Sequence, residues 1–395
     1  YLDNIPLDTA LVKFFDGLNR HDALPPIKGE FVPIIDSVGR ILINPVFANL
    51  SAPFVTTSAM DGIALKASLT FGINETNPKI LNDDEFEWID TGEPLPSKYD
   101  AVVMIENVER NKSGAVLLRS PVAPYQHVRK IAEDIAAPEL LLGRGAKIRS
   151  LDLASLGAAG VAEVEVAVKP RVALIPTGNE LVRLGDAPEP GNVIEFNSIF
   201  LSAMIESWGG TAHVQNSVPD EAGKIRAVLE ETTAMYDAVL IIAGSSAGSE
   251  DFTFRVIEES GEVFVHGVAI RPGHPVVLGV TNSVPVVGLP GYPASASITS
   301  ELFVKSLIRE FTGEIFDDGD FVLAKLARKI HSPMGDEEFL RVTVGRIDDT
   351  YVATPTARGA AMTLAMSRSD GIVRISADSE GIDEGDEIKV ALVRP

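Results

Sequence analysis

Residues 238–260 read AVLIIAGSSAGSEDFTFRVIEES, and the order of their parts indicates an α/β fold. Ala238–Ala243 is an uninterrupted apolar run, a glycine- and serine-rich loop follows it, and Phe252–Ser260 has the pattern of a helix. A strand that is apolar along its whole length is typical of a parallel sheet covered by helices on both faces. The stretch therefore predicts one strand–loop–helix unit of such a sheet.

The same alternation continues on both sides of this unit, over residues 170–312. Further strands are predicted at Arg171–Pro176, Ala212–Val218, Val276–Val280 and Val284–Gly288. Further helices are predicted at Asn197–Trp208, Glu221–Met235 and Ser295–Phe311. Asn197 is a candidate cap of its helix, and Gly209-Gly210 is a stop signal. These residues thus predict a three-layer α/β/α domain with a mostly parallel sheet.

The flanking regions have a different pattern. Residues 313–395 contain short alternating runs separated by Gly, Asp and Pro, which is typical of a small β-barrel or sandwich. The runs are Val322–Arg328, Phe339–Arg346, Tyr351–Thr356, Gly371–Ala377 and Glu387–Val393. Residues 51–134 also favour strands and loops, and a helical segment, Asp8–Leu18, comes before them. The chain is therefore predicted to be multidomain, α/β plus β.

Composition excludes several classes of protein. The net charge is -22, whereas nucleic-acid binding requires a basic face. No apolar run approaches the roughly 20 residues that span a bilayer, and there is no cysteine for disulfides or thiol chemistry. We therefore expect a cytoplasmic protein with neither nucleic acid nor membrane among its partners. Because the chain is strongly negative, an anionic ligand must be bound by cations and backbone N–H groups gathered in the loops.

Three glycine-containing loops follow predicted strands, after Ile175, Ile242 and Val287. Because open α/β sheets bind ligands at the carboxyl edge of their strands, these loops predict one shared site. Each loop by itself is also compatible with an ordinary rigid turn. Asp251 opens a helix after a loop suited to a phosphate, which makes it a candidate Mg²⁺ ligand.

Five motifs follow one another along the chain. They are Ser58–Gly62 (SAMDG), Pro176–Leu181 (PTGNEL), Ala243–Asp251 (AGSSAGSED), Arg271–Pro275 (RPGHP) and Gly288–Pro293 (GLPGYP). In this order and spacing they resemble the molybdopterin molybdenumtransferase family, the MoeA and gephyrin E-domain group, over nearly the whole chain. The resemblance implies a molybdopterin-binding α/β domain of 1–20 plus 170–312 and an elongated arm of 21–50 plus 135–169. It further implies a β-rich domain of 51–134 and a small C-terminal β-barrel of 313–395.

The resemblance also implies a set of site residues. Asp61, Glu180 and Asp251 stand at acidic positions that the family uses as metal ligands or bases. Arg271 and His274 stand at basic positions that assist oxyanion binding. The residues expected to bind the pterin and its phosphates are Thr91, Arg129, Asp134, Thr177, Gly178, Gly244, Ser245, Ser246, Gly248, Pro290, Gly291, Pro293 and Ser295.

The chain departs from the family pattern at four places. His274 stands where lysine is common, Asn179 where aspartate is common, and Ala132 where glycine is usual. The turn Arg358–Thr363 has fewer hydroxyl groups than the family's Ser/Gly-rich turn, so that Thr363 or Arg358 must substitute for them. The first two departures bear on the binding of oxyanion and metal.

The implied reaction inserts molybdate into adenylylated molybdopterin, with Mg²⁺-dependent release of AMP. The family also implies a homodimer, a molybdopterin adenylyltransferase upstream, and apo-molybdoenzymes or their chaperones downstream. Three alternatives remain: a tungsten-inserting paralogue, a non-catalytic molybdopterin-binding or scaffold protein, and a hydrolase of the competence-damage type. The hydrolase is expected to lack Ser58–Gly62 and the C-terminal β domain, both of which are present. Retention of Asp61, Glu180 and Asp251 favours catalysis over a scaffold.

Overall fold

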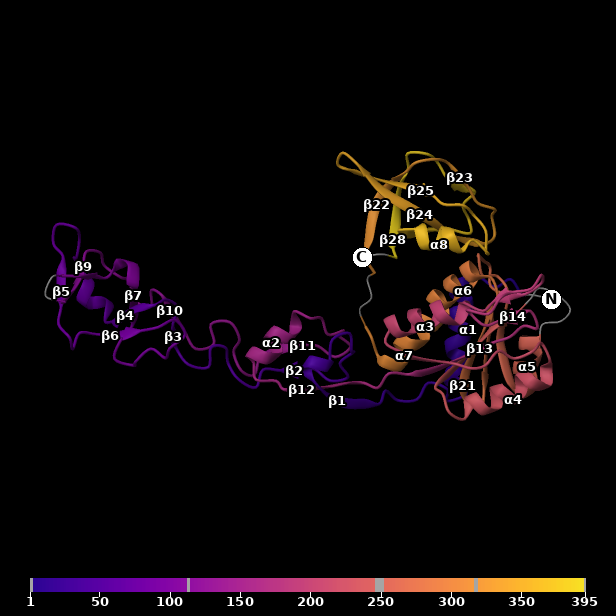
Figure 1. Ribbon diagram of the computed structural model, residues 1–395, viewed down its shortest axis with the longest axis horizontal. Coiled ribbons are helices and arrows are strands. Elements are labelled where there is room, and N and C mark those ends of the chain that lie inside the picture. Colours follow the sequence, from indigo (N-terminus) through magenta and orange to yellow (C-terminus); the bar gives the residue numbers. More distant parts are fainter. Residues whose placement is uncertain (1–2, 112–113, 246–251, 316–318, 394–395) are drawn as a thin grey trace. The chain divides into compact units, whose positions relative to one another are not determined.

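The computed structural model describes residues 3–111, 114–245, 252–315 and 319–393. Contacts between residues divide the chain into two compact units, Tyr1–Gly29 with Ala167–Pro395, and Glu30–Val166. The larger unit contains an α/β domain and a C-terminal barrel, whereas the smaller one is built mainly of short strands (Figure 1). No helix in the described ranges is long and apolar enough to cross a membrane.

A six-stranded sheet forms the centre of the α/β domain. Its strands run in the order β16 (Thr211–Val214), β13 (Arg171–Pro176), β17 (Ala238–Ser245), β21 (Val284–Pro290), β20 (Val277–Thr281) and β18 (Gly261–His266). The first four strands are parallel, whereas β20 and β18 run antiparallel to their neighbours. The prediction of a mostly parallel sheet is confirmed.

Helices cover both faces of this sheet, because alternate residues of each apolar strand enter different cores. Leu240 and Ile242 of β17 pack in one core and Val239 and Ile241 in the other. The first core takes α1 (Leu7–Arg20), α3 (Asn197–Ser207) and a continuous helix of α6 (Pro293–Thr299), the π-helical turn η4 (Ser300–Val304) and α7 (Lys305–Thr312). The second takes α4 (Ala222–Thr233) and α5 (Phe252–Ser260) (Figure 1).

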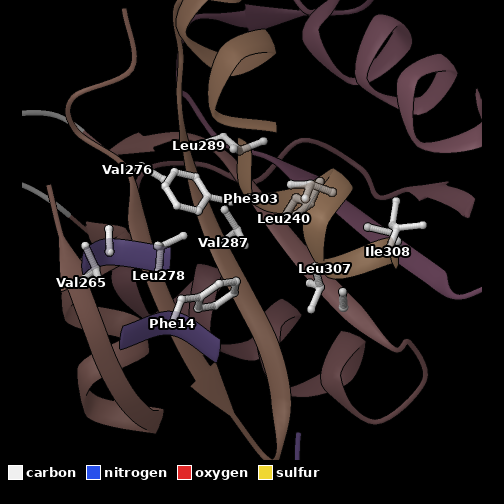
Figure 2. Packing of buried hydrophobic residues seen from close by; sticks show 14 of the residues in the cluster. Phe14, Leu240, Val265, Val276, Leu278, Val287, Leu289, Phe303, Leu307 and Ile308 are labelled. Atoms are coloured by element: carbon white, nitrogen blue, oxygen red, sulfur yellow. The ribbon is translucent and has the colours of Figure 1, made fainter. Parts of the chain in front are cut away.

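Aromatic and aliphatic side chains from distant segments meet in the first core (Figure 2). Phe14 of α1 and Phe303 of η4 are fully buried there beside Leu278 and Val287. Residues near the start of the chain therefore belong to the core of the α/β domain, although residues 30–166 of the other unit separate them in sequence from the rest of that domain. Such close-packed apolar burial supplies most of the stability of a domain of this kind.

The structure corrects three details of the predicted elements. Strand β16 ends at Val214 instead of continuing to Val218, because only its first four residues pair with β13. Strand β18 was not predicted, since an edge strand of six residues directly after a helix leaves a weak pattern. Asn197 is the first residue of α3 and not its cap; the Glu195 carboxylate accepts hydrogen bonds from the Ser198 N–H (2.9 Å) and hydroxyl (2.5 Å).

The C-terminal region is a closed barrel of five strands. They are β22 (Phe321–Leu326), β24 (Glu337–Ile347), β25 (Thr350–Pro355), β26 (Gly371–Ile375) and β28 (Glu387–Leu392). The order β24-β25-β22-β28-β26 closes through a direct pairing of β26 with β24. This confirms the predicted small barrel. The short helix α8 (Thr363–Arg368) begins at the last residue of the stretch Arg358–Thr363, in which a turn was expected.

The barrel docks on the α/β domain through β19 (Ile270–Arg271), which pairs with β24 in parallel. In addition, the Ala294 N–H near the start of α6 donates to the Ala360 carbonyl at 2.9 Å. Two small pairs complete the larger unit: β14 (Leu181–Val182) with β15 (Val193–Ile194), and β23 (Ile330–His331) with β27 (Gly381–Ile382).

The smaller unit has separate apolar cores along its length. One core contains Leu42, Ile148, Leu156 and Val164, which come from both passes of the chain through this unit. Its elements are β1 (Gly29–Pro33) paired with β12 (Glu163–Ala167), β2 (Val46–Phe47) with β11 (Leu140–Leu142), η1 (Ile34–Asp36) and α2 (Asp152–Ala158).

The other main core of the smaller unit lies within residues 63–122. It is enclosed by the sheets β6 (Phe86–Ile89)–β4 (Gly62–Leu65)–β7 (Ala101–Met104) and β5 (Lys79–Leu81)–β9 (Val116–Leu118)–β8 (Glu109–Arg110), with η2 (Ala67–Thr70) and η3 (Ile105–Asn107). A two-stranded pair, β3 (Thr57–Ser58) and β10 (Val128–Arg129), joins the ends of this region.

Candidate functional site

The carboxyl ends of β13, β17 and β21 meet at one edge of the sheet. β17 lies between the other two strands and runs parallel to both, so that the carboxyl ends of the three strands are neighbours. Thr177 joins two of these loops, since its N–H and hydroxyl both reach the Ile242 carbonyl, at 2.9 and 3.1 Å. Gly244 and Ser245 extend β17, and Ser245 stands in register with Pro290 of β21. The structure thus brings these predicted residues together.

Two carboxylates lie at this edge. Glu180 follows β13, and Asp220 lies on the segment between β16 and α4. Asp220 donates its N–H to the Asn179 side-chain oxygen at 3.3 Å, and its carboxyl group lies within hydrogen-bonding reach of the Thr177 hydroxyl. Burial, followed by the negative charge of Glu180, raises the pKa of the Asp220 carboxyl. Asp220 was not singled out from the sequence, although a carboxylate in the loop that follows a strand of a parallel sheet is a usable signal.

Gly178 holds Glu180 in place through its lack of a side chain. Its φ angle is +149°, and a Cβ atom there would lie 2.8 Å from Glu180 Oε1. We predict that Gly178→Ala costs about 1–3 kcal/mol of unfolding free energy, because it strains the backbone, and that it displaces the Glu180 carboxylate. Urea unfolding measures the first effect. An unchanged midpoint would contradict the steric argument, and Gly185→Ala, at a positive-φ glycine with open space around it, separates strain from contact.

The loop after β21 is held by α3. The Asn197 side-chain N–H donates to the Gly291 carbonyl at 2.7 Å, while its buried side-chain oxygen has no hydrogen-bond partner among the described residues. Pro293 begins α6, and the Ser295 side chain is buried beneath this start. The third predicted loop is therefore held against the start of α3. Ser246, Gly248 and Asp251 lie outside the described residues.

Arg271 lies where the barrel meets the α/β domain. Its Nε donates to Asp336 Oδ2 at 2.5 Å, and it lines a cavity of about 260 Å³ together with Arg341, Arg358 and Glu338. Glu338 is buried; one of its oxygens lies 3.5 Å from Arg358 Nε and the other has no partner in the described ranges. Three guanidinium groups around one cavity make a setting suited to an anion.

His274 does not share this setting. Its carbonyl accepts hydrogen bonds from the N–H groups of Val268 and Val276, both at 3.0 Å, which tightens the turn after β19. Gly273 between Arg271 and His274 has φ +120° and approaches α6, since a Cβ there would lie 2.7 Å from Thr299 Cγ2. The turn is thus shaped by backbone contacts, and the two predicted cations are not equivalent.

The smaller unit contains its own group of predicted residues. Asp61 Oδ1 accepts a hydrogen bond from the Thr91 N–H at 2.7 Å. The hydroxyl of Thr91, and then its N–H, hold the pKa of the exposed Asp61 carboxyl below its usual value. Further backbone bonds tie the two loops, from the Ser58 N–H to the Glu93 carbonyl and from the Gly92 N–H to the Ser58 carbonyl, both at 2.9 Å. SAMDG is therefore clamped to the Thr91 loop.

Arg129 lies on β10, which pairs with β3 next to SAMDG, and Asp134 lies in the turn region that follows β10. Arg129 stands in register with Thr57, and its Nε lies 3.7 Å from Glu133 Oε1. The Asp134 N–H donates to the Ala52 carbonyl at 3.0 Å, whereas Ala132 adopts φ +61°, a conformation that suits the glycine usual there. The predicted residues of this unit thus occupy two neighbouring stretches of one folded region.

A magnesium ion fits the carboxylates at the sheet edge. Within the described residues there is no group of three or more His, Cys, Asp or Glu side chains that could hold a metal ion. Mg²⁺, however, is commonly held by one or two carboxylates, with waters and substrate phosphates completing its shell. Glu180 and Asp220 supply such a pair. Burial, and then the negative charge of Glu180, raises the pKa of Asp220, and a shared cation would relieve the repulsion between the two carboxylates.

Three family models match the chain in sequence order. They are the MoeA N-terminal region (domain I and II) over residues 6–160, a "Probable molybdopterin binding domain" over residues 173–310, and the MoeA C-terminal region (domain IV) over residues 323–393. A molybdopterin biosynthesis protein of Methanocaldococcus jannaschii is 30% identical over 99% of this chain and 98% of its own length. The chain belongs to the MoeA family.

Other MoeA relatives agree over the full length. A crystal structure of the MoeA protein of Pyrococcus horikoshii is 32% identical, covers 100% of both chains and superposes with a TM-score of 0.81. A molybdopterin molybdenumtransferase of Bacillus subtilis is 27% identical over 92% of this chain and 90% of its own length. The family, the fold class and a transferase of molybdenum cofactor biosynthesis, all expected from the motifs, are confirmed. The roles of single MoeA residues stay predictions.

Proposed function

We propose that this MoeA protein inserts molybdate into adenylylated molybdopterin and releases AMP in a reaction that requires Mg²⁺. The observation that carries this proposal is the pair Glu180 and Asp220 at the sheet edge formed by the carboxyl ends of β13, β17 and β21. Two carboxylates at the carboxyl edge of a parallel sheet can hold Mg²⁺ against a phosphate and receive a proton. Asp61 is the third carboxylate in the proposal and belongs to the other unit.

The proposed roles follow from charge. Every reactant is an anion, so the arginine-lined cavity of Arg271, Arg341 and Arg358 is suited to hold oxyanion or phosphate groups. AMP leaves when a water oxygen bonds to the adenylyl phosphorus and the bond from that phosphorus to the bridging oxygen breaks. The pterin phosphate keeps the bridging oxygen, and the proton of the water passes to a carboxylate, for which Asp220 is the candidate. Mg²⁺ held by Glu180 and Asp220 would neutralise the charge that develops on the phosphates.

The test mixes the purified protein with adenylylated molybdopterin, Mg²⁺ and either molybdate or tungstate, and measures AMP. We expect AMP release that depends on oxyanion and on Mg²⁺. A higher rate with tungstate would assign the tungsten-inserting alternative. Tight binding of the pterin without release of AMP under either oxyanion would overturn the proposed enzymatic activity and support the scaffold alternative. One observation favours a scaffold: Arg271 is paired with Asp336, which reduces the positive charge available at a predicted cation.

We also propose that the protein acts as a homodimer in the cytoplasm. A molybdopterin adenylyltransferase would provide its substrate, and apo-molybdoenzymes or their chaperones would accept its product. In support of a dimer, the smaller unit exposes large apolar side chains: Phe31 (66% exposed), Ile35 (74%) and Leu151 (80%). Exposed apolar surface of this kind is typical of association sites.

The dimer has its own test. We predict that the double change Phe31→Glu and Ile35→Glu makes the protein monomeric at micromolar concentration, because charges placed on a buried apolar interface oppose association. Light scattering after gel filtration measures the mass. The matched control is Ile80→Glu, at another exposed residue (56%) of the same unit. A dimer that survives the double change would remove this surface from consideration.

A further inference from the structure

The chain between β13 and α3 links two loops of the sheet edge. After Glu180 it forms β14, makes a loop and returns as β15, which pairs with β14 in parallel. The Val193 N–H donates to the Glu180 carbonyl at 2.9 Å, and the Glu195 N–H donates to the Val182 carbonyl at 2.8 Å. The segment 180–197, which we call the strap, is therefore fixed at its first end to the residue that carries a candidate metal-binding carboxylate.

The second end of the strap is fixed to the loop after β21. The Glu195 carboxylate closes the first turn of α3, since it accepts hydrogen bonds from the N–H and the hydroxyl of Ser198 at 2.9 and 2.5 Å. Asn197 lies inside this turn as the first residue of α3, and its Nδ2 donates to the carbonyl of Gly291, 94 residues away in sequence, at 2.7 Å. One side chain thus connects the strap that begins at Glu180 with the loop between β21 and α6.

Stability alone does not account for an asparagine at this position. The Oδ1 atom of Asn197 is buried and has no hydrogen-bond partner among the described residues. Burying a polar atom without a partner costs free energy that is comparable with the gain from one hydrogen bond, here the bond that Nδ2 makes. A residue with this balance is more typical of a functional position than of a stabilising one.

The two loops that the strap connects lie some distance apart along the sheet edge. β17 separates β13 from β21, so the carboxyl ends of these two strands are two strand spacings apart, about 10 Å. Groups that act on one substrate across such a span must keep a fixed separation, because a displacement of about 1 Å can reduce a rate by about 10². The bond from Asn197 supplies such a restraint, since it fixes the Gly291 turn to the strap.

We propose that Asn197 is a positioning residue, which holds the Gly291 turn at a fixed separation from the Glu180 carboxylate. The inference rests on the proposed function, in which Glu180 helps to hold Mg²⁺ against the substrate phosphates. Asn197 then touches neither the metal nor the substrate, but it sets the geometry in which they meet. Its loss should therefore slow the reaction of the bound substrate more than it weakens binding.

Two substitutions at Asn197 separate positioning from stability. Asn197→Asp keeps the size of the side chain and places a carboxylate in the first turn of α3, where the helix dipole favours it, but it cannot donate to the Gly291 carbonyl. Asn197→Ala removes the donor without adding charge. In both variants we expect kcat for molybdate-dependent AMP release to fall about 10–100-fold. KM for adenylylated molybdopterin, and Kd for Mn²⁺ as a spectroscopic probe of the Mg²⁺ site, should change less than about threefold.

The matched control removes a comparable hydrogen bond at another place in the same domain. Asn282 lies in the turn between β20 and β21, before the first residue of β21, whereas Gly291 follows the last. Its Nδ2 donates to the Thr233 hydroxyl at 3.0 Å. Asn282→Ala should lower the melting temperature, measured by circular dichroism, and leave kcat unchanged.

Each outcome decides the role of Asn197. A kcat within about twofold of wild type in both variants, a decrease that Asn282→Ala reproduces, or an effect confined to KM would overturn the positioning role. If the wild type releases AMP and the Asn197 variants match it, only this inference fails and the transferase stands. A wild-type protein that releases no AMP would overturn the proposed function, and the positioning role with it.

Discussion

Asp220→Asn is expected to lower molybdate-dependent AMP release by about 10²–10⁴, the usual span for an acid–base or charge-stabilising group. Asparagine keeps the shape and an oxygen that reaches the Thr177 hydroxyl, but it can neither carry the charge for Mg²⁺ nor take up a proton. Because the substitution is nearly isosteric, the loss would report on chemistry and not on packing. The two carboxylates interact electrostatically. The activation free energy lost in the Asp220→Asn, Glu180→Gln double variant should therefore be smaller than the sum of the losses in the two single variants.

The same substitution is expected to stabilise the fold near neutral pH. Burial and Glu180 raise the pKa of Asp220 above its ordinary value of about 3.9. A carboxyl with a raised folded-state pKa stabilises fully below the unfolded-state pKa, and this contribution is lost as pH rises through the folded-state pKa. The ionised carboxylate is therefore a cost near pH 7 that Asp220→Asn removes, and the gain in melting temperature should shrink as the pH is lowered toward 4.

Thermal melts across this pH range and AMP assays on the same preparations test both expectations. Glu221→Gln is the matched control, since Glu221 is the exposed neighbour of Asp220 and forms an ion pair with Lys224 at 2.8 Å. A variant that keeps turnover within tenfold of wild type would remove Asp220 from the reaction. A melting temperature that falls at neutral pH would contradict the electrostatic account.

Asp61→Ala is expected to lower turnover by about 10²–10⁴ with little change in stability. The Asp61 carboxylate is exposed, so its removal leaves no cavity, yet it is the group that the clamped SAMDG loop presents. The hydrogen bonds from Thr91 lower its pKa, so that the carboxylate is ionised throughout the neutral range and is suited to metal or cation binding more than to proton transfer.

Thr91→Val separates these roles. It removes the hydroxyl that makes the largest contribution to the low Asp61 pKa but keeps the N–H bond. The pKa of Asp61 should therefore rise, and the acid limb of the activity profile should move to higher pH while the plateau changes less. Asp83→Asn, another exposed carboxylate of the unit, is the control for the Asp61 variant. An Asp61→Ala protein with turnover near wild type would exclude a role for SAMDG in the chemistry.

Much of the α/β domain could be predicted because each element carries its own pattern. β13 has the predicted bounds of Arg171–Pro176 and α5 those of Phe252–Ser260, since apolar runs and helix boundaries are local signals. β18 could not be found in this way, because an edge strand gains its structure from its neighbour β20. Likewise asparagine is a residue type that often caps helices, but the Asn197 side chain donates a hydrogen bond to the Gly291 carbonyl, which is distant in sequence.

The sequence by itself determined the family, the α/β and barrel domains, and the presence of glycine-containing loops after β13, β17 and β21. Strands and glycine-containing loops can be recognised from local sequence patterns. Only the tertiary structure decided which side chains act on one another. It places Asp220 near Glu180 and pairs Arg271 with Asp336. These outcomes depend on distance and burial between segments far apart in the chain, and electrostatic energy is set by those two quantities.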